Sequence, residues 1–221
     1  NLTKYEGTYV DSYFEEMVYP VLTPMAVDSS RPFPLIRNKS LNIAALVKKK
    51  KGDSELDFAM VRVPSGLPRV VVIPPEEGKE KAGISVIFLE EIIERNIEKL
   101  FLNYDIICSH PFRVMRNADL SIDEDEAEDL LKEIERQLKK RQWGEAIRLD
   151  IEEKADKRLL KILKKELKVT NDEIYEIGGP LDLTVLMKVY GLPGFDRHKA
   201  PGYTPQPVPA LMNDDDIFTN I

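Results

Sequence analysis

Residue types that carry catalytic or metal chemistry are scarce in this sequence of 221 residues. It contains one cysteine, Cys108, and two histidines, His110 and His198. A single cysteine excludes an internal disulfide framework, and its place in an apolar run predicts a buried, inert thiol. A tetrahedral zinc site needs about four ligands, so Cys108 and His110 do not predict a metal centre. Neither histidine is assigned a catalytic role.

Positive charge is also in short supply. The 32 Lys and Arg residues are outnumbered by 39 Asp and Glu residues, which gives a formal net charge of -7. A broad nucleic-acid surface rests on many basic contacts to phosphates, so DNA and RNA are not expected as partners. Any site for a polyanion must therefore be local.

Long apolar runs are missing as well. None approaches the roughly 18 to 20 residues that cross a bilayer, so no transmembrane segment is expected. The first ten residues lack the basic-then-apolar pattern of a signal peptide. Together with the single cysteine, this favours a reducing cytoplasm. The sequence opens without methionine and ends in an apolar stub at 218–221, which we interpret as a piece of a longer protein.

The pattern of apolar residues predicts an α+β fold, a mixed, mainly antiparallel sheet with several amphipathic helices packed on it. Helices are expected at 9–21, 89–102, 123–141, 155–167 and 181–189. Strands are expected at 41–48, 56–63, 69–73, 84–88, 104–109, 112–115 and 146–151. The first three strands suggest a meander, and 173–177 fits either a strand or a short helix. Prolines make 22–37 an extended loop and 191–213 an extended arm, and 214–221 resembles the start of a helix.

Two acidic runs could be taken for magnesium sites, because Mg²⁺ prefers oxygen ligands. The first comprises Glu124, Asp125, Glu126 and Glu128, and the second is 214–216. Neighbouring residues on a helix point in different directions, so neither run converges easily on one ion. Both runs stand at expected helix starts, where carboxylates complement the helix dipole. We interpret them as helix caps.

Basic residues offer two candidate anion sites. The run 48–51 is all lysine and could bind phosphates, but a lysine-rich hairpin tip also keeps a sheet edge soluble, and this interpretation is favoured. Arg69, Arg113 and Arg116 could fork onto phosphate oxygens. The many nearby carboxylates favour ion pairing for these arginines instead, and both alternatives stay open.

Five blocks of sequence occur in the order seen in one enzyme family. They are PVLTPMAVD at 20–28, RPFP at 31–34, VP and LPR within 63–69, FRVMRNADLSIDEDEAEDLL at 112–131 and GPLDLT at 179–184. In these blocks, which span nearly the whole chain, the sequence resembles the polyphosphate kinases that work through a phosphohistidine. Any one block alone is weak, whereas five in one order are specific.

The resemblance implies a single head domain at 1–221 that includes the arm 191–213, with the N-terminal helical domain and the C-terminal catalytic domains absent. It implies a likeness to phosphoinositide-binding PX modules. For the parent enzyme it implies reversible transfer of the ATP γ-phosphate through phosphohistidine to polyphosphate, with Mg²⁺. The reactive histidines and the ATP and Mg²⁺ ligands belong to the absent parts. No catalytic, cofactor or metal residue is therefore assigned in this chain, and it is expected to be inactive alone.

Three hypotheses for this chain's own role remain. The first is dimerisation and scaffolding, through contacts with a second copy and with the other domains of the same polypeptide, and its candidate contacts are the exposed apolar residues Phe14, Phe33 and Phe195. The second is an anion-binding module that guides the polyphosphate chain past Arg69, Arg113 and Arg116. The third, an autonomous enzyme, is disfavoured because the chain lacks the apparatus for phosphoryl transfer.

Overall fold

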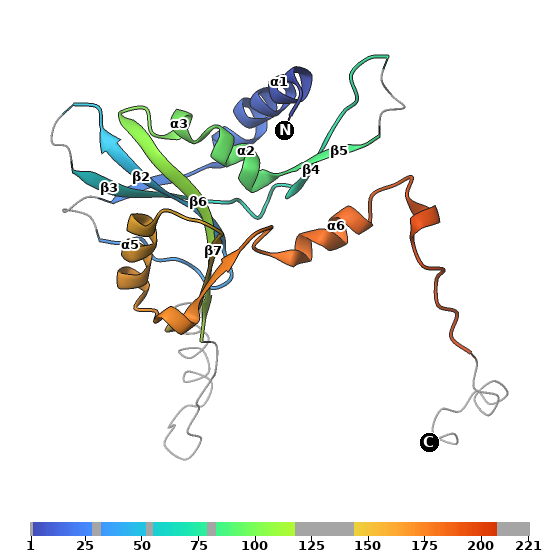
Figure 1. The fold of residues 1–221 in the computed structure, drawn as a ribbon. Coiled ribbons are helices and arrows are strands. Elements are labelled where there is room, and N and C mark those ends of the chain that lie inside the picture. The colour runs from blue at the N-terminus through green and yellow to red at the C-terminus, as the bar shows by residue number, and fades with distance from the viewer. Residues whose placement is uncertain (1, 28–31, 52–54, 79–82, 118–143, 207–221) are drawn as a thin grey trace, which may run out of the picture.

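A six-stranded sheet organises the chain in a computed structural model that describes residues 2–27, 32–51, 55–78, 83–117 and 144–206 (Figure 1). In sheet order the strands are β1 (Pro24–Val27), β3 (Leu56–Arg62), β2 (Leu41–Lys49), β6 (Tyr104–Arg116), β7 (Ala146–Glu152) and β8 (Ile174–Ile177). Neighbours are antiparallel except β7 and β8, which are parallel. The predicted fold class is confirmed.

Helices cover both faces of this sheet. One face carries α1 (Lys4–Tyr13), α2 (Leu89–Arg95) and α3 (Ile97–Leu100), while α5 (Lys157–Leu167) packs on the other (Figure 1). A separate two-stranded sheet, β4 (Val70–Ile73) and β5 (Ser85–Phe88), adjoins the first group. Two hydrophobic cores result, one on each face, which we call the first core (with α1 and α2) and the second core (with α5).

Strand β2 supplies both cores because it is buried on both faces. Ile43, Ala45 and Val47 enter the first core, and Ala44 and Leu46 enter the second. This explains the unbroken apolar run in the sequence, since alternate side chains of a strand point to opposite faces.

Strand β6 also contacts both cores, although its contributing residues are all even-numbered. Tyr104 and Ile106 pack against the first core, whereas Cys108, Phe112 and Val114 lie in or against the second. The pairing with β2 shifts here, because Leu46 is opposite Cys108 while Val47 is opposite Ile106. One residue, Ile107, is therefore extra and forms a β-bulge.

The expected pair of strands at 104–109 and 112–115 is wrong, since β6 runs through both. Pro111 does not interrupt the strand, because it lies one residue before the β6–β7 ladder begins at Phe112 and Ile151. On that side its missing N–H removes no ladder bond. The expected meander is also wrong, because β4 pairs with β5 rather than with β3.

The first helix begins earlier than expected. Thr3 and Glu6 form a capping box, in which the Thr3 hydroxyl accepts from the Glu6 N–H at 3.2 Å and the Thr3 N–H donates to Glu6 at 2.7 Å. After α1 the chain continues through a π-helical turn at Phe14–Val18 and a 3-10 turn at Tyr19–Val21. The following stretch was expected to be a loop, but it contains β1, an edge strand that begins with Pro24.

The later elements also differ in detail. The helix expected at 89–102 is divided at Asn96 into α2 and α3. The ambiguous 173–177 region is a 3-10 turn (Asn171–Glu173) followed by β8. The helix expected at 181–189 is a 3-10 turn, η4 (Leu183–Val185), that leads into the short α6 (Leu186–Tyr190).

The last described segment extends away from the sheet (Figure 1). Beyond α6 its regular structure is one 3-10 turn, Asp196–His198, as expected for a proline-rich arm. The helix expected at 123–141, the acidic caps and the end of the arm lie outside the described residues. No helix in the described part has the length and apolarity to cross a bilayer.

Candidate anion-binding site

A basic pocket of about 440 Å³ opens where three segments of the chain meet. Its lining comes from the turn before β2 and the start of that strand, the end of β3 and its connection to β4, and the residue that precedes η4. The polar and charged residues of the lining are Arg37, Asn38, Lys39, Ser40, Arg62, Ser65, Arg69 and Asp182. Four of them are cations and one is a carboxylate, so the pocket is locally positive in a chain whose net charge is negative.

Three of the cations have no anionic partner among the described residues. The charged groups of Arg37, Lys39 and Arg62 make no ion pair or hydrogen bond within the described ranges. Arg37 and Lys39 are exposed and Arg62 is half-buried. The antiparallel pairing of β2 and β3 places Arg62 opposite Asn42, and so next to the turn that holds the other two. These three are the groups that an incoming anion can meet directly.

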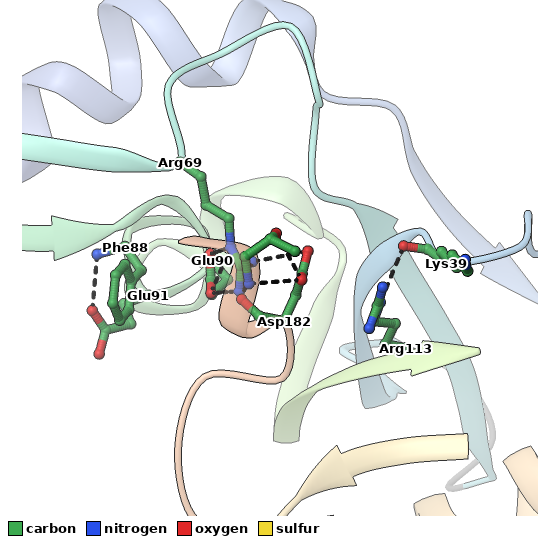
Figure 2. A network of polar contacts seen from close by, with 8 residues as sticks. Lys39, Arg69, Phe88, Glu90, Glu91, Arg113 and Asp182 are labelled. Carbon is green, nitrogen blue, oxygen red and sulfur yellow. Dashed lines mark hydrogen bonds and ion pairs between the residues drawn. The ribbon is translucent and has the colours of Figure 1, made fainter. Parts of the chain in front are cut away.

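The fourth cation, Arg69, is already engaged. Its Nη2 lies 2.6 Å from Glu90 Oε1, and its Nε contacts both carboxylate oxygens at 3.1 Å (Figure 2). Its Nη1 donates to the Asp182 backbone carbonyl at 2.9 Å and lies 3.3 Å from the Asp182 Oδ2. The expectation that Arg69 pairs with carboxylates is confirmed. Because the Glu90 side chain is only 8% exposed, this fork is chiefly structural.

Asp182 is held as an anion inside the pocket. Its Oδ1 accepts from the Thr184 N–H at 3.2 Å and from the Thr184 hydroxyl at 2.8 Å. Burial raises the pKa of Asp182, but these hydrogen bonds and the charges of Arg113 and Arg69 outweigh it, so the pKa is lowered overall. The carboxylate therefore remains ionised at neutral pH.

The other two predicted arginines differ in position. Arg113 lies beside the pocket, where its Nε donates to the Lys39 carbonyl at 3.3 Å (Figure 2). Arg116 does not line the pocket. It donates to the carbonyls of Ile36 and Gly144, both at 2.8 Å, and burial lowers its pKa. Arg116 therefore braces the end of β6 in the described structure.

The residues that the sequence did not point to are Arg37, Lys39 and Arg62. A signal was present, because cations stand just before one strand of a predicted hairpin and at the end of the other. Antiparallel pairing brings such ends together. The lysine run 48–51, the other candidate anion site, lies at the opposite end of that hairpin. There Lys49 lies 3.6 Å from Asp57, and Lys50 donates to the Leu102 carbonyl at 3.1 Å.

A second pocket, of about 460 Å³, is acidic. Glu94 and Glu152 line it, and with His110 they offer three ligand atoms within 4.8 Å of one another. No sequence motif indicates this cluster, because its members come from α2, β6 and β7. His110 Nδ1 lies 2.8 Å from Glu152, while Nε2 accepts from the Asp156 N–H at 3.2 Å.

The hydrogen bonds of His110 decide what this cluster can do. Since Nε2 accepts from a backbone N–H, the proton of the neutral ring lies on Nδ1 and is donated to Glu152. A metal ion here has to replace that proton and reverse the tautomer. The arrangement therefore fits a hydrogen-bonded brace between α2, β6 and β7 better than a cation site.

The proposed apolar contacts are only partly exposed. Phe14 is fully buried in the first core, so the prediction that it is exposed is wrong. It follows α1 on the inward face of the helix. Phe33 is half-buried with its ring 5.0 Å from that of Phe58, and Phe195 is 39% exposed. Cys108 is half-buried, and burial raises the pKa of its thiol.

Known proteins resemble this chain over its full length. A family model described as the polyphosphate kinase middle domain matches residues 6–189. A polyphosphate kinase of Halalkalibacterium halodurans is 44% identical over 223 residues, and one of Bacillus cereus is 41% identical over 224 residues. These matches cover 100% and 99% of this chain but 31% of each relative. The chain therefore spans about a third of their length.

A solved structure shows a similar fold. The crystal structure of polyphosphate kinase from Porphyromonas gingivalis matches with a TM-score of 0.69 at 22% identity. The match covers 100% of this chain and 31% of that chain. At this identity the likeness concerns the fold alone.

Proposed function

Since the chain belongs to the polyphosphate kinase family, as its middle domain, we propose that it binds the polyphosphate chain in the basic pocket. The full-length enzyme, in this proposal, transfers phosphate reversibly between ATP and polyphosphate in the cytoplasm, through a histidine that lies in another domain. The observation that carries the proposal is the set of three cations, Arg37, Lys39 and Arg62, that lack anionic partners in the described structure.

The chemistry of the pocket suits binding rather than reaction. Linear phosphates present a row of negative charges, which Arg and Lys side chains meet without any fixed sequence. The pocket volume lies within the range typical of ligand sites. Its one described carboxylate, Asp182, is already committed to Arg69 and Thr184, so the lining does not fit Mg²⁺ by itself. We therefore assign ATP and Mg²⁺ to other domains of the full-length enzyme.

The test is a binding titration with inorganic polyphosphate. We expect the double variant Arg37→Gln/Arg62→Gln to bind about tenfold more weakly, which corresponds to about 0.7 kcal/mol for each lost contact. Isothermal titration calorimetry on the 221-residue chain measures this. In the full-length enzyme the same variant should raise the KM for polyphosphate and leave kcat unchanged.

The matched control removes two charges elsewhere. Lys161 and Lys165 are exposed on α5, which packs on the opposite face of the sheet. The variant Lys161→Gln/Lys165→Gln should bind polyphosphate as the wild type does. If both double variants bind polyphosphate equally weakly, the affinity depends only on the net charge of the chain, and the pocket is not the binding site.

Scaffolding is a second candidate, favoured by exposed apolar side chains around α6. The α6 face comprises Leu183, Leu186, Met187 and Tyr190, which are 64%, 47%, 70% and 55% exposed. We propose that a second copy covers this face. Leu186→Asp/Met187→Asp should shift the full-length enzyme to monomers in sedimentation velocity, and an unchanged dimer rejects the idea.

A further inference from the structure

The basic pocket already contains an anion that belongs to the protein. Asp182 is the one carboxylate among the described residues that line it, and it comes from a different segment from the cations. Its Oδ2 lies 3.3 Å from Arg69 Nη1, and its side chain is 24% exposed. A phosphate that reaches Arg69 must therefore compete with Asp182.

The same residue begins the segment that carries the α6 face. Its Oδ1 caps η4 through the two hydrogen bonds from Thr184, and η4 leads directly into α6. Its backbone carbonyl accepts from Arg69 at 2.9 Å. Asp182 thus joins the wall of the pocket to the start of the helix.

Arg69 does not depend on Asp182 for its position. Three contacts with Glu90, between 2.6 and 3.1 Å, hold the guanidinium from the other side (Figure 2). If Asp182 withdraws, Nη1 of Arg69 remains in place and becomes available to another anion. The pocket then offers a fixed cation in addition to the unpaired ones.

The segment after Asp182 has few other anchors. Leu181 and Val185 are buried, but α6 has no buried residue and six of the eight residues at 183–190 are exposed. Loss of the Asp182 contact therefore loosens η4 and α6, while the buried Leu181 and Val185 keep the segment attached. The loosened part is the part that carries the α6 face.

We infer that Asp182 is a specificity-determining residue, an internal competitor that a linear phosphate chain displaces and orthophosphate does not. This inference rests on the proposed function. One phosphate group of a chain can replace Asp182 at Arg69 while the next groups meet Arg37 and Arg62, so the cost is shared over several contacts. A single phosphate lacks those additional contacts. Displacement also frees η4 and α6, which couples the pocket to the α6 face.

Asp182→Asn tests the competition, because it removes the charge and keeps an oxygen that can accept from Thr184. Calorimetry on the 221-residue chain should show tripolyphosphate binding about fivefold tighter or more, and a smaller preference for tripolyphosphate over orthophosphate. Asp172→Asn, an exposed site with the same change of charge, should leave both affinities unchanged. Tripolyphosphate binding that does not tighten in Asp182→Asn overturns the inference.

Hydrogen exchange on the wild type tests the displacement without any variant. Saturating tripolyphosphate should speed exchange of the amides at 183–190 by about threefold or more, because local opening becomes easier. Unchanged protection there overturns the inference even if Asp182→Asn does not fold. Binding that depends on Arg37 and Arg62 but leaves 183–190 protected removes the inference and keeps the proposed function. No tripolyphosphate binding at low salt removes both.

Discussion

The arginines of this chain show how one residue type takes different roles according to what surrounds it. Arg69 pairs with the buried carboxylate of Glu90, and Arg116 donates to backbone carbonyls. The guanidinium groups of Arg37 and Arg62 have no partner among the described residues. Only the last kind meets an incoming ligand directly, whereas Arg69 becomes available only when Asp182 withdraws. Substitution of Arg69 is therefore a poor probe of anion binding, since it leaves the buried carboxylate of Glu90 without its partner and destabilises the fold.

Glu94 provides a prediction about pH. Burial raises its pKa more than the hydrogen bond from Ser109 lowers it, and the charge of Glu152 raises it further. Its folded-state pKa thus lies above the unfolded value. The stability that this shift contributes is present below the unfolded pKa and is lost as the pH rises through the folded pKa.

We therefore expect Glu94→Gln to stabilise the chain at about pH 7, by about 2 °C in Tm, since a partly screened charge is removed and Ser109 keeps its acceptor. The gain should shrink at about pH 4, where the wild-type carboxyl is itself largely protonated. Thermal unfolding by circular dichroism measures both. Glu98→Gln, at an exposed site, is the control, and an equal gain in that variant contradicts the explanation.

What the sequence could reveal about the site was limited by distance along the chain. Arg69 was identified, yet its partners lie 21 and 113 residues away. Arg37 and Arg62 were missed although the hairpin of β2 and β3 was predicted, because the sequence points to its lysine-rich tip and not to the opposite end, where these two cations meet. The cluster at Glu94, His110 and Glu152 is more distant still, since three separate elements form it.

Among the helices, α5 ends in a residue whose backbone conformation is unfavourable for any side chain larger than glycine. Lys168 follows the helix with φ at 59°, in the left-handed region. A side chain there costs about 1 to 2 kcal/mol, and glycine relieves it. Lys168→Gly should therefore stabilise the chain by about 0.5 to 1 kcal/mol in urea unfolding.

Lys165→Gly is the matched control, since it makes the same change inside α5. It should destabilise by about 1 kcal/mol, because glycine weakens a helix interior. Opposite signs at these two sites identify the cap conformation as the cause. A loss of stability in both variants contradicts it.

The elements that the sequence predicted well are those with local causes. α5 has Asp156 as its N-cap and a buried stripe of Leu159, Leu163 and Leu167. The capping residue and the spacing of the leucines can both be recognised in the sequence. The errors arose where tertiary context decided. β4 consists of β-branched residues, which favour a strand, but nothing in its own sequence says that β5 rather than β3 is its neighbour.

At the scale of the whole molecule, net charge opposes the proposed ligand. The chain carries -7, so a polyanion is repelled at long range and attracted only near the pocket. The predicted single domain over 1–221 and the likeness to PX modules stay predictions. The family could be inferred from the sequence because its five blocks are each continuous in the chain. The pocket could not be, because its lining comes from segments that only folding brings together.

The local attraction predicts a modest salt dependence. By analogy with single-stranded nucleic acid, each phosphate contact contributes about -0.7 to the slope of log K against log salt. Three unpaired cations, Arg37, Lys39 and Arg62, therefore predict a slope of about -2 for polyphosphate. Titrations at several salt concentrations measure it, and Arg37→Gln/Arg62→Gln should reduce the slope to about -0.7. A slope that is unchanged in this variant places the contacts elsewhere.

The bulge at Ile107 has a consequence for how this domain can change over time. Side chains of a strand alternate between the two faces of the sheet, and the extra residue shifts this alternation by one. Tyr104 and Ile106 therefore face one core, while Phe112 and Val114 face the other. Deleting Ile107 restores strict alternation and turns one of these pairs away from its core. Insertions and deletions that loops absorb freely are therefore barred from this strand, even at a residue whose own side chain is 43% exposed.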